Sequence, residues 1–321
     1  MTGPLLEVAD LRVSFPRVGG HRRVVAGISY SLQAGRTLGV VGESGCGKSI
    51  TALALMGLVP PPGRVAGSIR FAGRELLGQS RAAWRALRGG DIAMVFQEPM
   101  TALNPVMTVG RQIAEALVLH REGMGWREGE REAVGLLDAV GINAPRERAR
   151  AYPHQLSGGM RQRAVIAMAL ACEPRLLIAD EPTTALDVTI QAQILDLMLD
   201  LQDRIGMAIQ FISHNLAVVS EIAHDIIVMY AGRIVEQAGA EALFAQPLHP
   251  YTQGLIATLP DPAQRVARLP VIAGGVADVE SGGGCRFADR CPRADAACRA
   301  AEPAVEEIAP GHLVACFKAG A

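Results

Sequence analysis

The chain has 321 residues and a mass of 33.9 kDa, more than one average domain needs and enough for a large domain with an appended unit. Half of the residues are hydrophobic and 20% are charged, which excludes an intrinsically disordered chain. The 31 basic and 32 acidic residues leave a net charge of −1, which argues against a dominant nucleic-acid-binding surface. No apolar run reaches the roughly 18 residues of a membrane span. The first ten residues do not resemble a signal peptide, so we expect the chain to remain in the cytosol.

The predicted secondary structure alternates between strands and helices along most of the chain. Residues 1–45 read as strands, and the apolar run Thr37–Val41 is typical of a buried strand in a parallel sheet. A predicted helix at 50–58 ends before Pro60. The further expected elements are strands at 65–71 and 91–96, helices between 109 and 151, a helix at 158–171, a strand at 175–179, a helix at 189–205 and a strand at 207–212. This alternation predicts an α/β fold with a mainly parallel sheet, to which a β-rich first part and a helix-rich middle part are attached.

The composition changes after about residue 245. Prolines become frequent there, and the glycines Gly282–Gly284 precede a group of cysteines. We therefore expect two domains. The first is residues 1–255, with a helical subdomain at about 100–172, and the second is a small C-terminal extension of residues 256–321.

A segment with the spacing of a phosphate-binding loop follows the strand Thr37–Val41 and reads Gly42-x-x-x-x-Gly47-Lys48-Ser49. Glycines allow backbone N–H groups to surround phosphate oxygens, while Lys48 can reach the β- and γ-phosphates and the Ser49 hydroxyl can bind Mg²⁺. The alternative is a glycine-rich turn with a surface lysine. Lys48 is one of two lysines among 31 basic residues, which suggests that arginine cannot replace it. The expected nucleotide contacts of this loop are Gly42, Glu43, Ser44, Gly45, Cys46, Gly47, Lys48, Ser49 and Ile50.

Two carboxylates end the predicted strand at 175–179. Asp180 is suited to hold Mg²⁺, and Glu181 can polarise an attacking water molecule. The alternative is an acidic pair that precedes the next helix. After a phosphate-binding loop, the catalytic interpretation is the stronger one.

A second phosphate-binding element is predicted at the start of the helix at 158–171. Ser157 and the N–H groups of Gly158 and Gly159 lie at this helix start, where an anion can bind. The segment Leu156–Met160 resembles the signature Leu-Ser-Gly-Gly-Gln of the ATP-binding-cassette (ABC) family, with Met160 in place of glutamine. The resemblance implies an ABC nucleotide-binding domain with a RecA-like core, an antiparallel β subdomain and an α-helical subdomain. It also implies that Ser157 faces a nucleotide held by another subunit.

Other ABC motifs follow in order. Gln97 resembles the glutamine that links Mg²⁺ and water to the membrane partner, and Asp187 ends a segment that resembles the D-loop. His214 resembles the switch histidine near the γ-phosphate, although Asn215 replaces the usual aspartate after it. Phe15 stands where the family places an aromatic residue that stacks on adenine, while a strand phenylalanine is more often part of the core. The resemblance thus implies Glu181, His214 and Gln97 as catalytic residues, with Ser49, Gln97 and Asp180 around Mg²⁺.

Three stretches resemble the ATPase subunits of bacterial oligopeptide and dipeptide importers, in particular the first of the two cassette subunits. They are residues 97–105, 180–193 and 247–252. The resemblance implies ATP hydrolysis coupled to solute import at the cytoplasmic face of the bacterial inner membrane. It implies a second, non-identical ATPase, two permease subunits and an extracytoplasmic solute-binding protein as partners, and no nucleic acid.

Other functions remain open at this point. The cargo can be nickel, glutathione or another small solute, because relatives of the peptide importers carry these. A remote alternative is an ABC ATPase outside transport, in DNA repair or translation. A regulatory module that does not hydrolyse ATP is disfavoured by the presence of Lys48, Asp180, Glu181 and His214.

Four of the six cysteines lie in the last 37 residues, at Cys285, Cys291, Cys298 and Cys316. In a cytosolic chain, such cysteines are more often metal ligands than disulfides. Their wide spacing favours a [4Fe–4S] cluster over zinc, which prefers closer cysteine pairs, and reduced thiols or disulfides are a third possibility. Arg286, Arg290, Arg293 and Arg299 are expected to offset the negative charge of a cluster. Cys46 and Cys172 lie outside this group.

Overall fold

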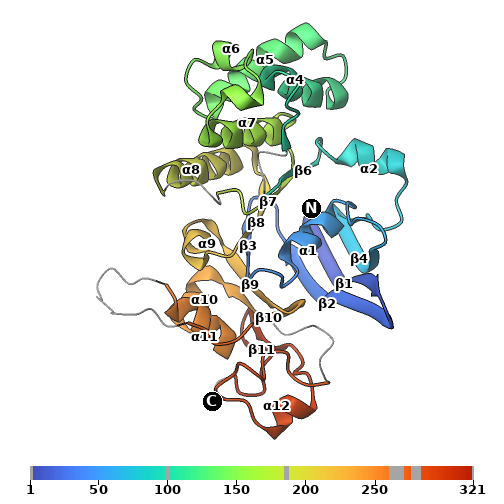
Figure 1. The fold of residues 1–321 in the computed structure, drawn as a ribbon, viewed down its shortest axis with the longest axis vertical. Coiled ribbons are helices and arrows are strands. Elements are labelled where there is room, and N and C mark those ends of the chain that lie inside the picture. The colour runs from blue at the N-terminus through green and yellow to red at the C-terminus, as the bar shows by residue number, and fades with distance from the viewer. Residues whose placement is uncertain (1–2, 98–101, 184–187, 260–270, 276–282, 320–321) are drawn as a thin grey trace. The chain divides into compact units, whose positions relative to one another are not determined.

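The computed structural model describes residues 3–97, 102–183, 188–259, 271–275 and 283–319, and Figure 1 shows its elements. The chain divides into two compact units. The first contains residues 1–33, 37–77 and 211–321, and the second contains residues 34–36 and 78–210. The phosphate-binding loop and the cysteine-bearing segment therefore belong to the first unit, while the Ser-Gly-Gly signature belongs to the second.

The first unit contains a four-stranded antiparallel sheet with the order β2-β1-β4-β5. Its strands are β1 (Leu6–Arg17), β2 (Gly20–Leu32), β4 (Arg64–Phe71) and β5 (Arg74–Glu75). Large apolar side chains on β1 and β2 alternate with exposed ones, because one face of this sheet is buried and the other is in solvent. This is the β-rich first part that the sequence predicts.

A second set of strands in the same unit carries the phosphate-binding loop. The order is β11-β12-β10-β9-β3, and β3 is parallel to β9, while β10, β12 and β11 add on in antiparallel fashion. The strands are β3 (Thr37–Val41), β9 (Asp225–Tyr230), β10 (Arg233–Gly239), β11 (Glu306–Ala309) and β12 (His312–Val314). All five residues of β3 are buried, which confirms the prediction of a buried parallel strand from its apolar run.

Five short helices accompany these strands in the first unit. They are α1 (Lys48–Leu55), α9 (Leu216–Ile222), α10 (Ala240–Ala245), α11 (Pro250–Ala257) and α12 (Ala296–Ala300). Helix α1 begins directly after the phosphate-binding loop, and α11 begins with Pro250, whose missing N–H and fixed φ suit the first helical position.

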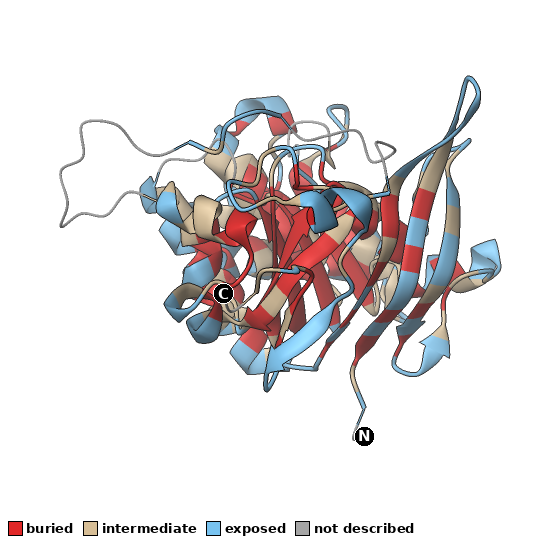
Figure 2. Ribbon diagram, turned by 90° about the horizontal axis from the view of Figure 1, so that it is seen from below, coloured by how far each residue is buried: buried red, intermediate tan, exposed pale blue. Residues whose placement is uncertain are grey.

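The second unit pairs β6 (Ile92–Val95) in parallel with β7 (Leu176–Asp180), and every residue of both strands is buried. Strand β8 (Ala208–Ser213) runs from this unit into the first, and all of its residues are buried too. The helices of the unit are α2 (Arg81–Leu87), α4 (Val109–His120), α5 (Trp126–Ala139), α6 (Pro145–Arg148), α7 (Gly158–Leu170) and α8 (Val188–Ile205), with a 3₁₀ turn, η1, at Pro153–Gln155. Figure 2 shows that the buried residues concentrate in the strands, while the outer helix faces are exposed. No helix in the described part of the chain has the length and apolar character needed to cross a bilayer.

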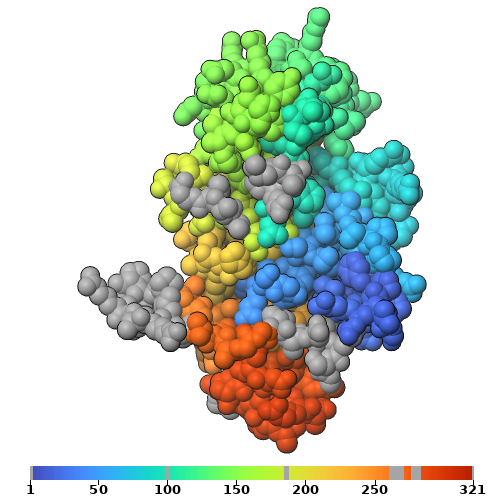
Figure 3. Space-filling model, viewed as in Figure 1, coloured from blue at the N-terminus to red at the C-terminus, as the bar shows by residue number. Residues whose placement is uncertain are grey.

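The C-terminal segment adds strands and polar contacts to the first unit. Strand β12 pairs with β10, and the red C-terminal residues lie against the orange segment of α10 and α11 in Figure 3. The carboxylate of Glu236 on β10 is fully buried and accepts the N–H groups of Leu248 and His249 at 2.7 and 2.9 Å. It also lies 2.8 Å from the Nε2 atom of His312 on β12. One buried carboxylate thus joins α11 and β12 to β10.

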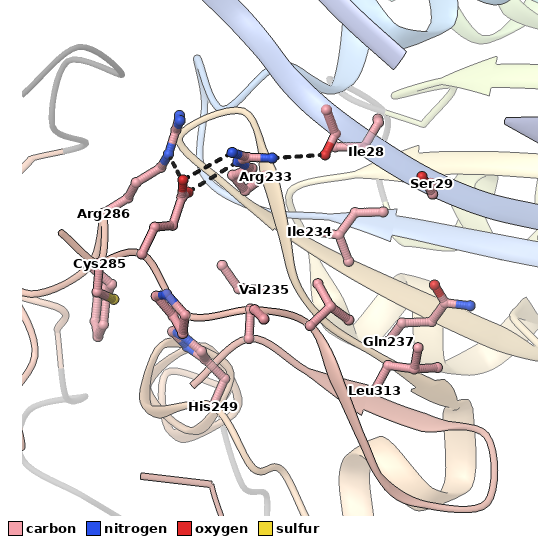
Figure 4. Close-up of a pocket in the computed structure, with 17 residues that line it drawn as sticks. Ile28, Ser29, Arg233, Ile234, Val235, Gln237, His249, Cys285, Arg286 and Leu313 are labelled. Carbon is pink, nitrogen blue, oxygen red and sulfur yellow. Dashed lines mark hydrogen bonds and ion pairs between the residues drawn. The ribbon is translucent and has the colours of Figure 1, made fainter. Parts of the chain in front are cut away.

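A cavity of about 530 Å³ lies between this segment and strands β2 and β10 (Figure 4). Arg233 and Arg286 converge on the carboxylate of Glu302 at its edge, with N–O distances of 2.9 and 2.8 Å. Arg233 also donates to the carbonyl oxygen of Gly27 on β2 at 3.1 Å. Glu302 therefore ties the extension to Arg233 on β10, and Arg233 in turn joins β10 to β2. The predicted boundary at residue 256 stays a prediction.

Candidate nucleotide-binding site

The loop between β3 and α1 has the backbone of a phosphate cradle. Gly47 precedes α1 with a φ of 107°, and no side chain caps the first turn of this helix. A Cβ atom at Gly42 would lie 2.2 Å from the carbonyl oxygen of Met229, so only glycine fits where β3 leaves the sheet. Ser44 and Gly45 are exposed, and nothing lies within 4 Å of the position of a Cβ at Gly45. The loop therefore presents open backbone to solvent next to a helix N-terminus, as anion binding requires.

Lys48 is buried and held by the loop itself. Its Nζ atom donates to the carbonyl oxygens of Gly42 at 2.7 Å and Glu43 at 3.0 Å. Cys46 is also buried, and burial raises the pKa of its thiol. Its side chain lies under Gly42 and does not face the open side of the loop, so Cys46 can contact a phosphate only through its backbone. Ser49 and Ile50 in the first turn of α1 are half-buried.

Glu43, one of the residues expected to contact nucleotide, has both of its polar groups bonded within the chain. Its N–H donates to the hydroxyl of Tyr251 at 2.8 Å. Its carboxylate forms two ion-pair contacts with Arg290, at 2.8 and 2.9 Å. Both polar groups are therefore engaged by the C-terminal part of the chain, and the nucleotide contact expected of Glu43 stays a prediction.

Two further predicted residues lie in the first unit. His214 is exposed directly after β8, and Asn215 caps α9 by accepting the N–H of Ala217 at 3.0 Å. Asparagine and aspartate are equally good caps, which is why the unusual residue at 215 leaves this turn intact. Phe15 on β1 is half-buried and does not belong to the fully buried core, so part of its ring is accessible for stacking.

In the second unit, the predicted glutamine and glutamate meet. The side-chain amide of Gln97, which follows β6, donates to the carboxylate of Glu181 at 3.2 Å. Asp180 at the end of β7 is buried. Glu181 has a φ of 48°, in the left-handed region that non-glycine residues rarely adopt, and such strain often marks a functional position. The parallel pairing of β6 with β7 places these residues at the same sheet edge.

The signature segment begins α7. The hydroxyl of Ser157 accepts the N–H of Met160 at 3.3 Å, and Ser157 and Gly158 are exposed. The sequence gives no role to Gln162, which is buried one turn further on and donates to the carbonyl oxygen of Pro182. Gln162 thus joins the signature helix to the residue after Glu181. Its place on the inner face of the helix, next to the signature, is the feature of the sequence that could have indicated this role. Asp187 lies outside the described residues.

The four C-terminal cysteines are free thiols and electrostatic neighbours. The N–H of Cys285 donates to the carbonyl oxygen of Cys298 at 2.7 Å. Burial raises the pKa of the Cys285 thiol, and the nearby Cys298, Cys316 and Cys291 raise it further. In the parts of the chain that the structure covers, no three His, Cys, Asp or Glu side chains converge closely enough to hold a metal ion. The described residues therefore show no preformed set of metal ligands at these cysteines, so both the [4Fe–4S] cluster and the zinc alternative stay predictions.

Three of the four arginines between these cysteines pair with carboxylates in the described part of the chain. Arg286 pairs with Glu302, Arg290 with Glu43, and Arg299 with Asp289. These partners lie 10 to 247 positions away along the chain, so local spacing alone did not predict them. The positive charge of Arg293 lowers the pKa of the Cys316 thiol, although burial raises that pKa overall. The expectation that the four arginines offset the charge of a cluster stays a prediction.

Comparison with known proteins identifies the family. The sequence model of the ABC transporter family matches residues 25–184, and that of the oligopeptide/dipeptide transporter C-terminal region matches residues 235–298. A probable peptide ABC transporter ATP-binding protein of Sinorhizobium fredii, y4tR, is 52% identical over 318 residues, which are 98% of this chain and 95% of the relative. The chain belongs to the ATP-binding proteins of peptide ABC transporters.

Further comparisons agree with this ABC family assignment. The dipeptide transport ATP-binding protein DppD of Escherichia coli is 51% identical over 316 residues, covering 97% of this chain and 96% of the relative. Among solved structures, a dimeric ATP-binding cassette, MJ0796, bound to ADP and phosphate, matches with a TM-score of 0.67. It covers 73% of this chain and 98% of its own, at 23% identity, which shows the ABC cassette fold. The predicted ABC fold, with a C-terminal extension of the peptide-transporter type, is confirmed.

Proposed function

We propose that this chain is the ATP-hydrolysing subunit that energises import of dipeptides or oligopeptides through an ABC transporter. The observation that carries the proposal is the match of about half identity over nearly the full length to relatives named for dipeptide and peptide transport. The match to the C-terminal region of oligopeptide/dipeptide transporters supports the same cargo class.

In this proposal the chain's own residues divide the work on ATP. Phe15 stacks on adenine, the Gly42–Ile50 loop binds the phosphates, and Lys48 leaves its contacts with loop carbonyls to reach the β- and γ-phosphates. Ser49, Asp180 and Gln97 are the oxygen donors for Mg²⁺, which they suit because Mg²⁺ prefers hydroxyl, carboxylate and amide oxygens. Bound Mg²⁺ neutralises charge on the phosphates.

Glu181 is the general base of the proposed reaction. Its carboxylate takes a proton from the attacking water, and Gln97, which donates to that carboxylate, orients it. His214 holds the γ-phosphate geometry, and Asp187 of the D-loop-like segment contributes to nucleotide binding. Ser157, Gly158 and Gly159 bind the γ-phosphate of the nucleotide that the second cassette holds, which makes hydrolysis depend on two cassettes.

The proposed reaction requires partner subunits. They are a second, non-identical ABC ATPase, two transmembrane permease subunits and an extracytoplasmic solute-binding protein. The chain lies peripherally at the cytoplasmic face of the bacterial inner membrane. Closure of the two cassettes on ATP drives the permeases, and hydrolysis resets them.

The substitution Glu181→Gln tests the catalytic assignment. We expect the variant to bind ATP with an affinity close to that of the unchanged chain, because glutamine keeps the shape of the side chain. Hydrolysis should fall by at least about 100-fold, the usual contribution of a general base. Both are measured on the full-length chain with its partner subunits. Lys48→Ala is the control that loses binding itself, and a Glu181→Gln variant with undiminished hydrolysis refutes the assignment.

We infer that Cys285, Cys291, Cys298 and Cys316 hold a [4Fe–4S] cluster. Four thiols in 32 consecutive residues are the donor set of such a cluster. After burial, the nearby Cys298, Cys316 and Cys291 raise the pKa of the Cys285 thiol, which supports a shared site. A cubane is wider than one ion, so its ligands stand further apart than the ligands of zinc. Bound iron and sulfide supply charge delocalisation and a possible redox change.

Anaerobic purification tests the cluster. About four iron atoms and four acid-labile sulfides per chain, with absorbance above 350 nm, are expected. Cys172→Ser is the control, because Cys172 lies in the second unit and should leave the iron content unchanged. Stoichiometric zinc without iron, or a chain free of both metals, contradicts the cluster.

A further inference from the structure

A buried arginine of the C-terminal segment is clamped on the phosphate-binding loop. The guanidinium of Arg290 contacts both carboxylate oxygens of Glu43, at 2.8 and 2.9 Å, from 247 positions further along the chain. The Arg290 side chain is 6% exposed. A bidentate pair between a planar guanidinium and a carboxylate fixes the orientation of both groups, and burial protects it from screening by salt.

The remaining N–H groups of Arg290 are also engaged. Its Nε atom donates to the carbonyl oxygen of Ala273 at 2.8 Å, and Nη2 donates to that of Ile272 at 3.2 Å. Nη1 lies 3.4 Å from the hydroxyl of Tyr230, which accepts. The guanidinium is thus held in one orientation by several acceptors, so it is a rigid anchor for Glu43.

Tyr251 provides a second tie to the same loop residue. Its hydroxyl accepts the N–H of Glu43 at 2.8 Å, while its ring is fully buried. The ring lies 4.8 Å from that of Tyr230 and 5.4 Å from that of Phe287. Two of the chain's four tyrosines thus contact Glu43 or its partner Arg290. The backbone and the side chain of Glu43 are therefore both fixed from the C-terminal part.

The clamp matters for nucleotide because of where Glu43 stands. It directly follows Gly42, and its carbonyl oxygen accepts the Nζ atom of Lys48 at 3.0 Å. A carboxylate left without its arginine would be a free negative charge beside a loop that has to bind a triphosphate, and it would compete for Lys48. Arg290 pairs with this charge and so keeps it from competing for Lys48.

We propose that Arg290 is a positioning residue of the nucleotide site, through which the cysteine-bearing segment sets the affinity of the phosphate-binding loop for ATP. This rests on the proposed function only in that the loop binds ATP. Arg290 directly precedes Cys291 in a tight turn, where the N–H of Arg290 donates to the carbonyl oxygen of Phe287 at 3.0 Å. The N–H of Cys291 donates to that of Ala288 at 3.3 Å. A change of structure at Cys291 therefore moves Arg290.

Titration of the full-length chain with a fluorescent ATP analogue tests the clamp. Arg290→Ala should raise the dissociation constant by about tenfold or more, within the range of typical couplings between two sites. Glu43→Gln should have a small effect, because it removes the charge that Arg290 neutralises. The double variant Arg290→Ala with Glu43→Gln should bind ATP within about threefold of the unchanged chain. This rescue separates charge control from a structural role, in which the double variant would be at least as impaired as Arg290→Ala.

Arg286→Ala is the matched control. It removes an arginine of the same turn, whose partners are Glu302 and the carbonyl oxygen of Ala231, so it should lower the melting temperature without weakening ATP binding. An Arg290→Ala variant that binds ATP normally, or no rescue in the double variant, overturns the proposal. Loss of ATP binding in Lys48→Ala but not in Arg290→Ala would refute the clamp while leaving the proposed function in place.

The link to the cysteine segment has its own measurement. Cys291→Ser should raise the dissociation constant for ATP in the unchanged chain and have no further effect in the double variant, because the clamp is already absent there. Equal effects of Cys291→Ser in both backgrounds, or none in either, overturn the link.

Discussion

At the scale of single residues, His249 shows how burial sets a protonation state. It is 1% exposed, its Nδ1 atom accepts the backbone N–H of Tyr251 at 3.0 Å, and its backbone N–H donates to the carboxylate of Glu236. Desolvation lowers the pKa of His249 to about 4. The imidazole is therefore neutral at pH 7 and acts as the N-cap of α11.

The pKa of His249 predicts a loss of stability in mild acid. The pKa is about 4 when folded and about 6.5 when unfolded, so the unfolded chain binds more protons between these values and stability falls as the pH drops from about 6.5 to about 4. The loss should reach about 3 kcal/mol at most, with no further contribution below pH 4. His249→Asn keeps an acceptor at the cap and should show a flatter dependence. Chemical denaturation at pH 7, 5.5 and 4.5 measures both, and parallel curves would exclude His249 as the source.

The roles of some single residues could be predicted from the sequence, and those of others could not. Lys48 and Glu181 were identifiable because they occupy fixed offsets from glycines or from the end of an apolar strand. Glu43 was identified only as a residue of the loop, and the structure bonds its N–H to the hydroxyl of Tyr251. Nothing near Glu43 in the sequence indicates this partner.

At the scale of elements, the shape of the loop between strand β3 and helix α1 depends on glycines that make close contacts with neighbouring backbone. Gly42 has a φ of 152°, and a Cβ there would lie 2.2 Å from the backbone oxygen of Met229 on β9. Because β3 and β9 are hydrogen-bonded neighbours, neither backbone can shift without breaking the parallel pair. The loop's shape is therefore fixed by the adjacent strand as well as by its own sequence.

Gly42→Ala tests this dependence. The substitution should cost several kcal/mol of stability through the backbone clash and abolish ATP binding. Gly73→Ala is the control, since Gly73 also has a positive φ, of 80°, but nothing lies within 4 Å of its Cβ position. That control should cost about 1 kcal/mol and leave binding unchanged. Thermal unfolding and nucleotide titration provide the measurements, and equal costs for the two variants would refute the role of the Met229 contact.

Elements differ in how well their sequences predicted them. The strands at Thr37–Val41 and Leu176–Asp180 were predictable, because a short apolar run can only be satisfied by burial on both faces. Strands β11 and β12 were not predicted. Strand β11 is exposed along its length, and β12 has only three residues, so neither carries an apolar alternation long enough to predict a strand. Pairing defines them instead, because β12 pairs with β10 and β11 pairs with β12.

At the scale of the whole molecule, the C-terminal extension is tied to the rest of the first unit at three places. Glu236 joins β10 to His312, Glu302 joins Arg286 to Arg233, and Arg290 reaches Glu43. The sequence predicts a change of composition near residue 245 and a group of cysteines, but gives no sign that these residues contact the phosphate-binding loop. The extension is thus placed to influence the nucleotide site.

The sequence by itself determined the α/β alternation, the phosphate-binding loop, the Asp180–Glu181 pair and the ABC resemblance. These features are local, because each depends on spacing within one loop or along one strand, and the chain carries them directly. Only the tertiary structure decided the partners of Glu43, the neutral cap at His249 and the neighbours of the four cysteines. Such contacts join residues up to 247 positions apart. Their energy comes from burial and paired charge, which leave no periodic pattern in the sequence.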